Sequence, residues 1–178
     1  MLPGRSESLL SKFKTCRPRG RWTIKAIRVS INLTGRGNNY AYNIERMTSF
    51  EGDTGPYLQY AHVRLSSMER KNPELLPLPP ISEIDVSLLN EPKARDIVFH
   101  LGTYPEAVRM ALKTREPSGI VTYCMKLSHL ISSAWDVLQV KGEPNLEKAK
   151  ARLWLFICAR DVLGAGMRLL TLTPLERM

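Results

Sequence analysis

Residues 48–64 read Thr-Ser-Phe-Glu-Gly-Asp-Thr-Gly-Pro-Tyr-Leu-Gln-Tyr-Ala-His-Val-Arg, and this stretch decides the fold of the chain. Its first half is rich in turn-forming residues, and Pro56 suits the first turn of a helix. Apolar residues then recur at spacings of three and four, namely Leu58, Ala61, Leu65 and Met68. The pattern predicts a helix from Pro56 to about Lys71 that buries one face in a core.

A second set of residues follows the same helical period beside the apolar stripe. Tyr57, Tyr60 and Arg64 lie along the neighbouring edge of the predicted helix. Two phenols and a guanidinium in this arrangement can stack unpaired bases and hold a phosphate. Alternatively, the tyrosines only cover the rim of the core. The residues of the helix leave both interpretations open.

The charge of the chain is distributed unevenly. Residues 1–37 hold nine Lys/Arg and one acidic residue, whereas residues 38–178 hold 17 basic and 16 acidic residues. The net charge of +9 therefore belongs almost entirely to the N-terminal part. A basic tail binds RNA or anionic lipid without sequence specificity, through counterion release. Charge is thus weak evidence for the function of the remainder.

Several classes of function find no support in the sequence. No apolar run approaches the ~20 residues that a membrane-spanning helix needs. Cys16, Cys124 and Cys158 are far apart and form no Cys-x-x-Cys pair, which disfavours a disulfide framework and a zinc site. The three histidines fall on separate predicted helices and form no His-x-x-x-His pair. We therefore predict neither a catalytic site nor a bound metal.

The rest of the chain is predicted to form helices joined by Pro/Gly turns. The expected elements are a packed turn over 75–80, a short helix over 83–89, helices over 91–101, 105–114, 117–140 and 146–163, and a short turn over 166–170. Asn90 and Asn145 are the predicted N-caps, Gly164 is a predicted helix end, and residues 173–176 have the capping-box pattern. The predicted fold is an all-α helical bundle with an irregular basic N-terminal tail.

Three blocks of the sequence resemble one family of enzymes. Residues 45–62, Glu-Arg-Met-Thr-Ser-Phe-Glu-Gly-Asp-Thr-Gly-Pro-Tyr-Leu-Gln-Tyr-Ala-His, resemble the segment of arginyl-tRNA synthetase (arginine–tRNA ligase) that leads into its C-terminal DALR-type anticodon-binding domain. Residues 122–138 and 161–178 resemble the middle and the end of the same domain. The blocks occur in the family's order over about residues 36–178, which makes the resemblance specific.

The resemblance implies a domain organisation. Residues 38–178 would form the anticodon-binding helical domain. Residues 1–37 show no resemblance to the family and are expected to be a disordered basic leader, although their composition also fits an organelle transit peptide. The His-x-Gly-His and Lys-Met-Ser-Lys-Ser signatures of the family's catalytic domain are absent from the chain. Arginine activation by this chain alone is therefore not expected.

The resemblance also implies which residues meet RNA. In the family, two tyrosines that correspond to Tyr57 and Tyr60 line a cup that receives the splayed anticodon bases. Trp135 stands where the family has a tyrosine, so it keeps a stacking face and replaces the phenol with an indole. The terminal residue Met178 would approach the anticodon as well. The best candidates for phosphate contacts are three arginines, Arg64, Arg168 and Arg177.

These observations lead to a set of expectations about partners and place. The chain is expected to bind arginine-accepting tRNA as a monomer, without a cofactor of its own; ATP and Mg²⁺ belong to the full-length family enzyme. A separate catalytic chain or domain would supply the chemistry. No membrane association is expected, and the location would be cytoplasmic or, alternatively, mitochondrial. The competing hypothesis is a helical scaffold or interaction module that has lost RNA specificity.

Overall fold

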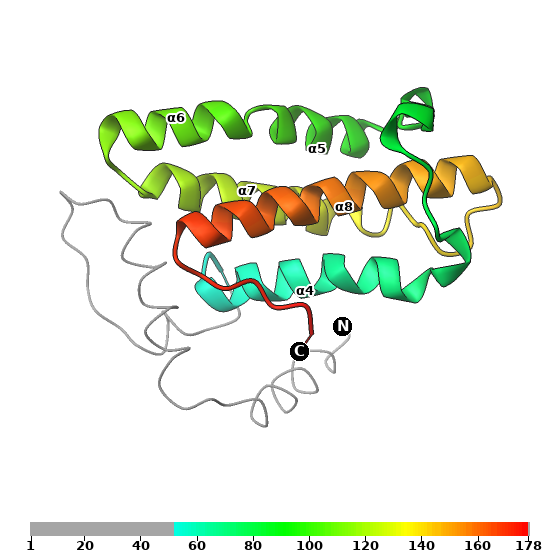
Figure 1. The fold of residues 1–178 in the computed structure, drawn as a ribbon, viewed down its shortest axis with the longest axis horizontal. Coiled ribbons are helices and arrows are strands. Elements are labelled where there is room, and N and C mark those ends of the chain that lie inside the picture. The colour runs from blue at the N-terminus through cyan, green and yellow to red at the C-terminus, as the bar shows by residue number, and fades with distance from the viewer. Residues whose placement is uncertain (1–51, 178) are drawn as a thin grey trace, which may run out of the picture.

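The computed structural model describes residues 52–177, and these residues form a bundle of helices (Figure 1). The helices are α4 (Gly55–Lys71), α5 (Pro92–Gly102), α6 (Tyr104–Thr114), α7 (Ser118–Ala134) and α8 (Leu146–Leu169). No strand occurs within this part of the chain, so the prediction of an all-α bundle is confirmed. The basic tail, the expected boundary near residue 37 and Met178 lie outside the described residues.

The long helix α8 is the centre of the bundle. It packs against α4 on one side and against α5 and α7 on the other. Helices α5 and α6 follow one another nearly end to end, and both lie over α7 (Figure 1). Four large side chains of α8 have no exposed surface: Leu153, Phe156, Leu163 and Met167. Helix α4 therefore lies at the opposite side of the molecule from α5 and α6.

Helix α4 forms as the sequence predicts. Thr54 is its N-cap, with a side chain that accepts a hydrogen bond from the backbone of Tyr57 at 3.4 Å. Pro56 lies in the first turn, and Pro73 follows the C-cap residue. The predicted apolar stripe is buried along its whole length.

The connector after α4 packs against the bundle as a turn. Leu75 is buried, and the indole Nε1 of Trp154 donates a hydrogen bond to the carbonyl oxygen of Pro79 at 2.9 Å. Two 3-10 turns, Ile81–Glu83 and Val86–Leu88, replace the single short helix expected over 83–89. No helix between residues 52 and 177 has the length and apolar character needed to cross a membrane.

The start of α5 and the end of α7 differ from their predicted positions. Glu91, not Asn90, is the N-cap residue of α5, and its carboxylate binds Lys148 and Arg152 on α8 instead of capping the helix. Helix α7 ends at Ala134, well before the expected Val140. The chain tightens there because the backbone N–H of Leu138 bonds the Ala134 carbonyl at 2.7 Å, and this turn buries the Leu138 side chain completely.

Helix α8 continues through Gly164, which was expected to end it, and through Gly166, which was expected to begin a separate short turn. The predicted end of this helix is therefore wrong. A Cβ atom on Gly166 would lie 2.5 Å from the Sγ atom of Cys124, and one on Gly164 would lie 3.1 Å from Nε2 of His62. These glycines therefore serve the close packing of α8 on α7 and α4. The helix instead ends in a Schellman motif: Thr171 has a φ of 61°, and the N–H of Leu172 bonds the carbonyl of Met167 at 2.9 Å.

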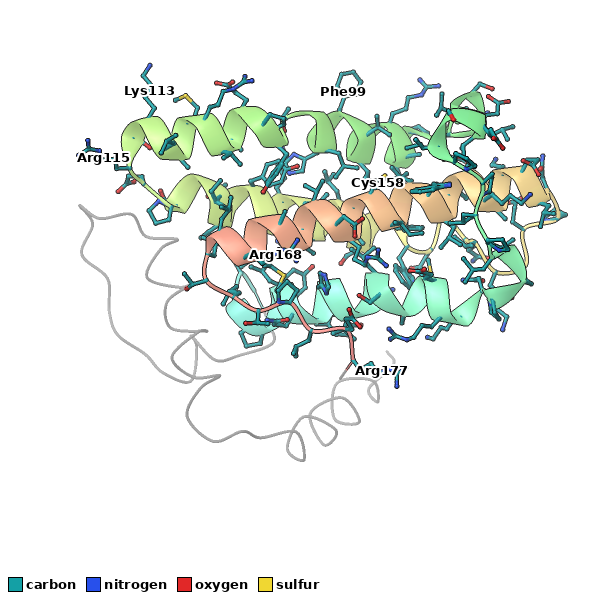
Figure 2. The ribbon with its side chains drawn as sticks, in the orientation of Figure 1. Phe99, Lys113, Arg115, Cys158, Arg168 and Arg177 are labelled. Atoms are coloured by element: carbon teal, nitrogen blue, oxygen red, sulfur yellow. The ribbon has the colours of Figure 1, made fainter. Side chains whose placement is uncertain are left out.

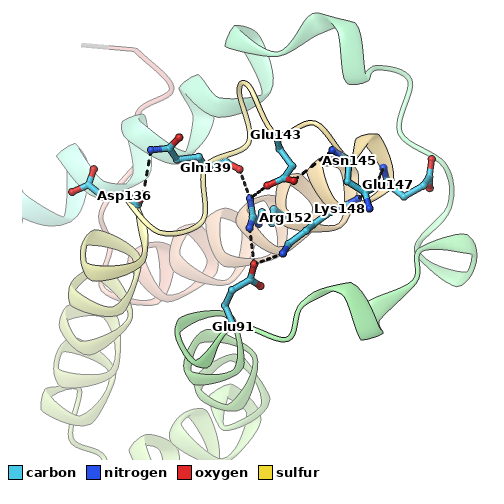
Figure 3. A network of polar contacts seen from close by, with 8 residues as sticks. All are labelled: Glu91, Asp136, Gln139, Glu143, Asn145, Glu147, Lys148 and Arg152. Carbon is cyan, nitrogen blue, oxygen red and sulfur yellow. Dashed lines mark hydrogen bonds and ion pairs between the residues drawn. The ribbon is translucent and has the colours of Figure 1, made fainter.

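A buried ionic network joins α8 to the start of α5 and to the loop before α8 (Figure 3). Arg152 is only 5% exposed and donates to the Glu91 carboxylate at 2.6 Å, the Glu143 carboxylate at 2.5 Å and the Gln139 carbonyl at 2.6 Å. Lys148 reaches the same oxygen of Glu91 at 2.7 Å. Burial opposes ionisation of Glu91, but the hydrogen bonds from Lys148 and Arg152 outweigh it and lower the pKa of Glu91 to about 2.

Candidate nucleic-acid interface

One rim of α4 carries the side chains that the sequence singles out. Tyr57, Tyr60 and Arg64 follow the period of about 3.6 residues per turn and flank the buried stripe on the same side. All three are half-buried. Each thus packs its stem against the bundle and keeps part of its surface in solvent. We call these residues, together with Trp135, the aromatic edge.

Tyr57 is fixed to α7 through its phenol. The hydroxyl lies 3.1 Å from Oγ of Ser132 and 3.4 Å from Nδ1 of His129, and the two rings are 5.3 Å apart. Nε2 of His129 lies 2.8 Å from the carboxylate of Asp53, in the turn before α4. The ring of Tyr57 is therefore held in one orientation by residues from two segments.

Sequence reasoning missed these three supporting residues. Asp53 and His129 are 76 residues apart in the sequence, so no local spacing links them. The only available signal was the Ser132-Ser133 pair next to Trp135, which belongs to a block that resembles the family.

Arg64 and Trp135 form one unit. The guanidinium carbon lies 3.8 Å from the centroid of the indole ring, a cation–π contact. The indole also packs against the buried Phe156, at a centroid distance of 5.7 Å. Burial lowers the pKa of Arg64, and Tyr60, Asp136 and Tyr57 nearby act in the opposite direction. A base that approaches this face of Trp135 meets the guanidinium plane, on which bases also stack.

Tyr60 lies between Tyr57 and the Arg64–Trp135 pair along the aromatic edge. Its side chain makes no hydrogen bond with the part of the chain that the structure describes. No hydrogen bond within residues 52–177 would have to break for the phenol to donate to or accept from a ligand.

Arg168 lies on α8 and Arg177 on the segment after it (Figure 2), so neither is on the rim of α4 that carries Tyr57, Tyr60 and Arg64. Arg168 borders a groove of about 860 Å³ that His62 and Glu69 line from the other rim of α4, with Thr173 on the segment after α8. Both arginines are exposed. The structure thus brings Tyr57, Tyr60, Arg64 and Trp135 together and places Arg168 and Arg177 elsewhere; Met178 is outside the described residues.

The described residues offer little for covalent or metal chemistry. No group of three or more His, Cys, Asp or Glu side chains between residues 52 and 177 could hold a metal ion. Burial raises the pKa of the Cys124 thiol to about 12, and burial also raises the pKa of Cys158. Neither thiol forms the reactive thiolate at neutral pH.

Several known proteins are similar to this chain in sequence. A family model described as the DALR anticodon binding domain matches residues 58–178. The cytoplasmic arginine–tRNA ligase of Saccharomyces cerevisiae is 52% identical over 155 residues, which cover 87% of this chain and 25% of the relative. The mitochondrial arginine–tRNA ligase of the same yeast is 43% identical over 155 residues, which cover 87% of this chain and 24% of the relative. The chain spans about a quarter of the length of these curated relatives.

Two solved structures have the same fold. Arginyl-tRNA synthetase from Thermus thermophilus superposes with a TM-score of 0.80 and 26% identity, over 98% of this chain and 30% of that protein. The enzyme from Plasmodium falciparum superposes with a TM-score of 0.75 and 20% identity, over 97% of this chain and 31% of that protein.

Proposed function

The chain belongs to the DALR anticodon-binding domain family of the arginine–tRNA ligases, and from this premise we propose that it binds arginine-accepting tRNA through the aromatic edge. The observation that carries the proposal is the assembly of Tyr57, Tyr60 and Arg64 on one rim of α4, with Trp135 from the end of α7 packed against Arg64. Unstacked anticodon bases are the RNA feature that such a surface recognises.

Stacking supplies most of the affinity in this proposal. Residues 38–178 hold 17 basic and 16 acidic residues, so bulk attraction to phosphate is weak for this part of the chain. Tyr57 offers a ring of fixed orientation, and Tyr60 offers a ring with a hydroxyl that can bond a base edge. Arg64 contributes a positive charge at the same place, and Arg168 and Arg177 contact the RNA backbone farther along the surface.

The proposal extends to the setting in which the chain acts. tRNA binding requires no cofactor here, and ATP and Mg²⁺ serve a catalytic domain that lies in a separate chain or in a longer product. The chain binds tRNA as a monomer. Its relatives include cytoplasmic and mitochondrial ligases, and we propose a cytoplasmic location, with the mitochondrion as the alternative.

Binding of in vitro transcribed tRNA tests the proposal. Tyr60→Ala should weaken binding of an arginine tRNA by ~1–3 kcal/mol, because each lost base–aromatic stack costs that much. Tyr57→Ala should do the same, whereas Tyr57→Phe keeps the ring and should retain most of the affinity.

The matched control is Phe99→Ala, on the far side of the molecule. Phe99 is 79% exposed and points away from α4 (Figure 2), so its removal should leave binding unchanged. Equal binding of unrelated tRNAs, with no loss in either tyrosine variant, would overturn the proposal and favour an interaction module without RNA specificity.

A further inference from the structure

The segment that follows α8 returns to α4 and is held there by side chains from the middle of that helix. The amide Nε2 of Gln59 donates to the carbonyl oxygen of Thr173 at 2.9 Å, and its Oε1 accepts from the backbone N–H of Leu175 at 3.0 Å. Nδ1 of His62 donates to the Leu175 carbonyl oxygen at 2.7 Å. Both backbone groups of Leu175 are thus satisfied by α4, as a neighbouring strand would satisfy them.

These contacts are shielded from water. Gln59 is 2% exposed and His62 is 7% exposed, although both are polar. A buried polar group that loses its partner pays the full cost of desolvation, so the bonds strongly favour one position of the segment. Because a carbonyl oxygen only accepts, Nδ1 of His62 carries the hydrogen in this contact.

Helix α8 is shaped to admit the imidazole. A Cβ atom on Gly164 would lie 3.1 Å from Nε2 of His62. Glycine at this position lets the ring fit between α4 and the backbone of α8. Gln59 and His62 of α4 and Gly164 of α8 therefore serve the same arrangement, although the helices that carry them are about 100 residues apart in the sequence.

Helix α4 thus carries two different surfaces on its two rims. Tyr57, Tyr60 and Arg64 lie on one side of the buried stripe, and Gln59 and His62 lie on the other. The segment held by Gln59 and His62 bears the exposed Arg177 and forms one wall of the groove that Arg168 borders. Helix α4 therefore sets the distance between the aromatic edge and the segment that bears Arg177, whereas Arg168 is carried by α8.

We propose that Gln59 and His62 are positioning residues for RNA binding: they fix the C-terminal segment on α4 so that one tRNA contacts the aromatic edge and the segment together. The inference rests on the proposed function. Neither residue needs to touch the RNA, since both act through the backbone of Thr173 and Leu175.

A double-mutant cycle tests this role in the full chain. Gln59→Leu keeps the volume and removes both polar atoms, and it should weaken binding of an arginine tRNA transcript about tenfold. Removal of residues 173–178 should weaken binding at least as much. The two changes combined should be no worse than the truncation alone, because the variant acts only through the segment. Gln139→Leu, at an exposed loop position, is the matched control and should bind normally.

Hydrogen exchange gives a readout that a general loss of stability would not reproduce. In Gln59→Leu the amide of Leu175 should exchange faster, while core amides of α8 should keep their protection. Gln59→Glu retains an acceptor for the Leu175 N–H and should recover part of the tRNA affinity.

Two results would overturn the positioning role: normal tRNA binding by Gln59→Leu, or losses from Gln59→Leu and from the truncation that add in full. If the unaltered chain fails to bind the transcript, the proposed function fails together with the role in RNA binding. Exchange at Leu175 then still decides whether Gln59 and His62 hold the segment, so the two failures are distinguishable.

Discussion

The network around Arg152 and the aromatic edge both join side chains from different helices, yet they differ in how far they are buried. Arg152 is 5% exposed and bonds three acceptors, and its partner Glu91 also binds Lys148. The aromatic edge is half-exposed, and Tyr60 makes no side-chain hydrogen bond within the described residues. The first set is closed to a ligand, and the second has surface and hydrogen-bonding groups available for one.

The difference shows where charge is used in this domain. The most buried ion pairs within residues 52–177 hold α8 to the start of α5 and to the loop before α8. The surface that we assign to RNA relies on rings, with one guanidinium placed over an indole at 3.8 Å. A search for functional residues by charge alone would select the Arg152 network and would miss the aromatic edge.

Arg152→Met should produce the largest effect and would break the structural side of the comparison. The substitution leaves Glu91 and Glu143 without their buried cation, and loss of one partner of a buried ion pair costs about 3–5 kcal/mol. The free energy of unfolding, measured by urea denaturation, should fall by this amount. Binding of tRNA by the folded fraction should not change.

The control for this prediction is Arg109→Met, which breaks an exposed pair with Glu106. Both side chains are more than half exposed, at 76% and 63%, so its cost should stay within about 0.5 kcal/mol. Equal costs for the two arginine variants would contradict the structural role of the buried network.

Gly166→Ala should have the next largest effect, because the new Cβ atom would lie 2.5 Å from Sγ of Cys124. Overpacking of this kind costs about 1–3 kcal/mol. Cys124→Ala removes the sulfur atom, so the double variant should be more stable than Gly166→Ala alone. Urea denaturation of the two single variants and the double variant measures this coupling. Additive losses would mean that the glycine is needed for a reason other than its contact with Cys124.

This pair of glycines also explains where sequence reasoning failed. The periodicity of α4 and the N-cap at Asn145 were predicted correctly, because each depends on residues within a few positions of one another. Gly164 was predicted to end α8, but its role is to admit His62, 102 residues earlier in the sequence. The residue with left-handed backbone conformation that ends α8 is Thr171. Threonine, unlike glycine, does not predict a helix end from the sequence.

In the candidate site, too, the features set by local spacing were predicted and those set by packing between helices were not. Tyr57, Tyr60 and Arg64 share one helix, so their common edge followed from spacing alone. The stacking of Arg64 on Trp135 and the contacts of Tyr57 with Ser132 and His129 depend on how α7 packs on α4. Local patterns contain no information on that packing.

Trp135→Ala sharpens the functional side of the comparison and should have a smaller effect. Loss of the indole frees Arg64 and removes a contact worth about 0.5–1 kcal/mol at a partly exposed site. A double-mutant cycle of Trp135→Ala and Arg64→Ala should show a coupling of this size in tRNA binding. Trp135→Tyr keeps an aromatic face and should retain most of the coupling. Independent effects of the two alanine variants would show that the pair does not act as a unit when RNA is bound.

The smallest expected effect is a pH dependence that separates the two rims of α4. Burial lowers the pKa of His62 below its ordinary value of 6.5; the bond to Leu175 opposes this shift, and Arg160 and Arg168 add to it. The unfolded chain therefore binds more protons at this residue, and its contribution to stability is full above pH 6.5 and declines as the pH falls below that value. His100, with a pKa that burial also lowers, contributes in the same direction, whereas Glu91 titrates well below this window.

The melting temperature should drop between about pH 7.5 and 5.5, and His62→Gln should reduce the drop. An equal drop in His62→Gln would assign the whole effect to other groups. The protection factor of the Leu175 amide should fall with acid before those of the α4 amides. Protonated His62 still donates to the Leu175 carbonyl, but burial and the positive charges of Arg160 and Arg168 disfavour the imidazolium while the segment covers it, and the contacts of the aromatic edge do not depend on this charge.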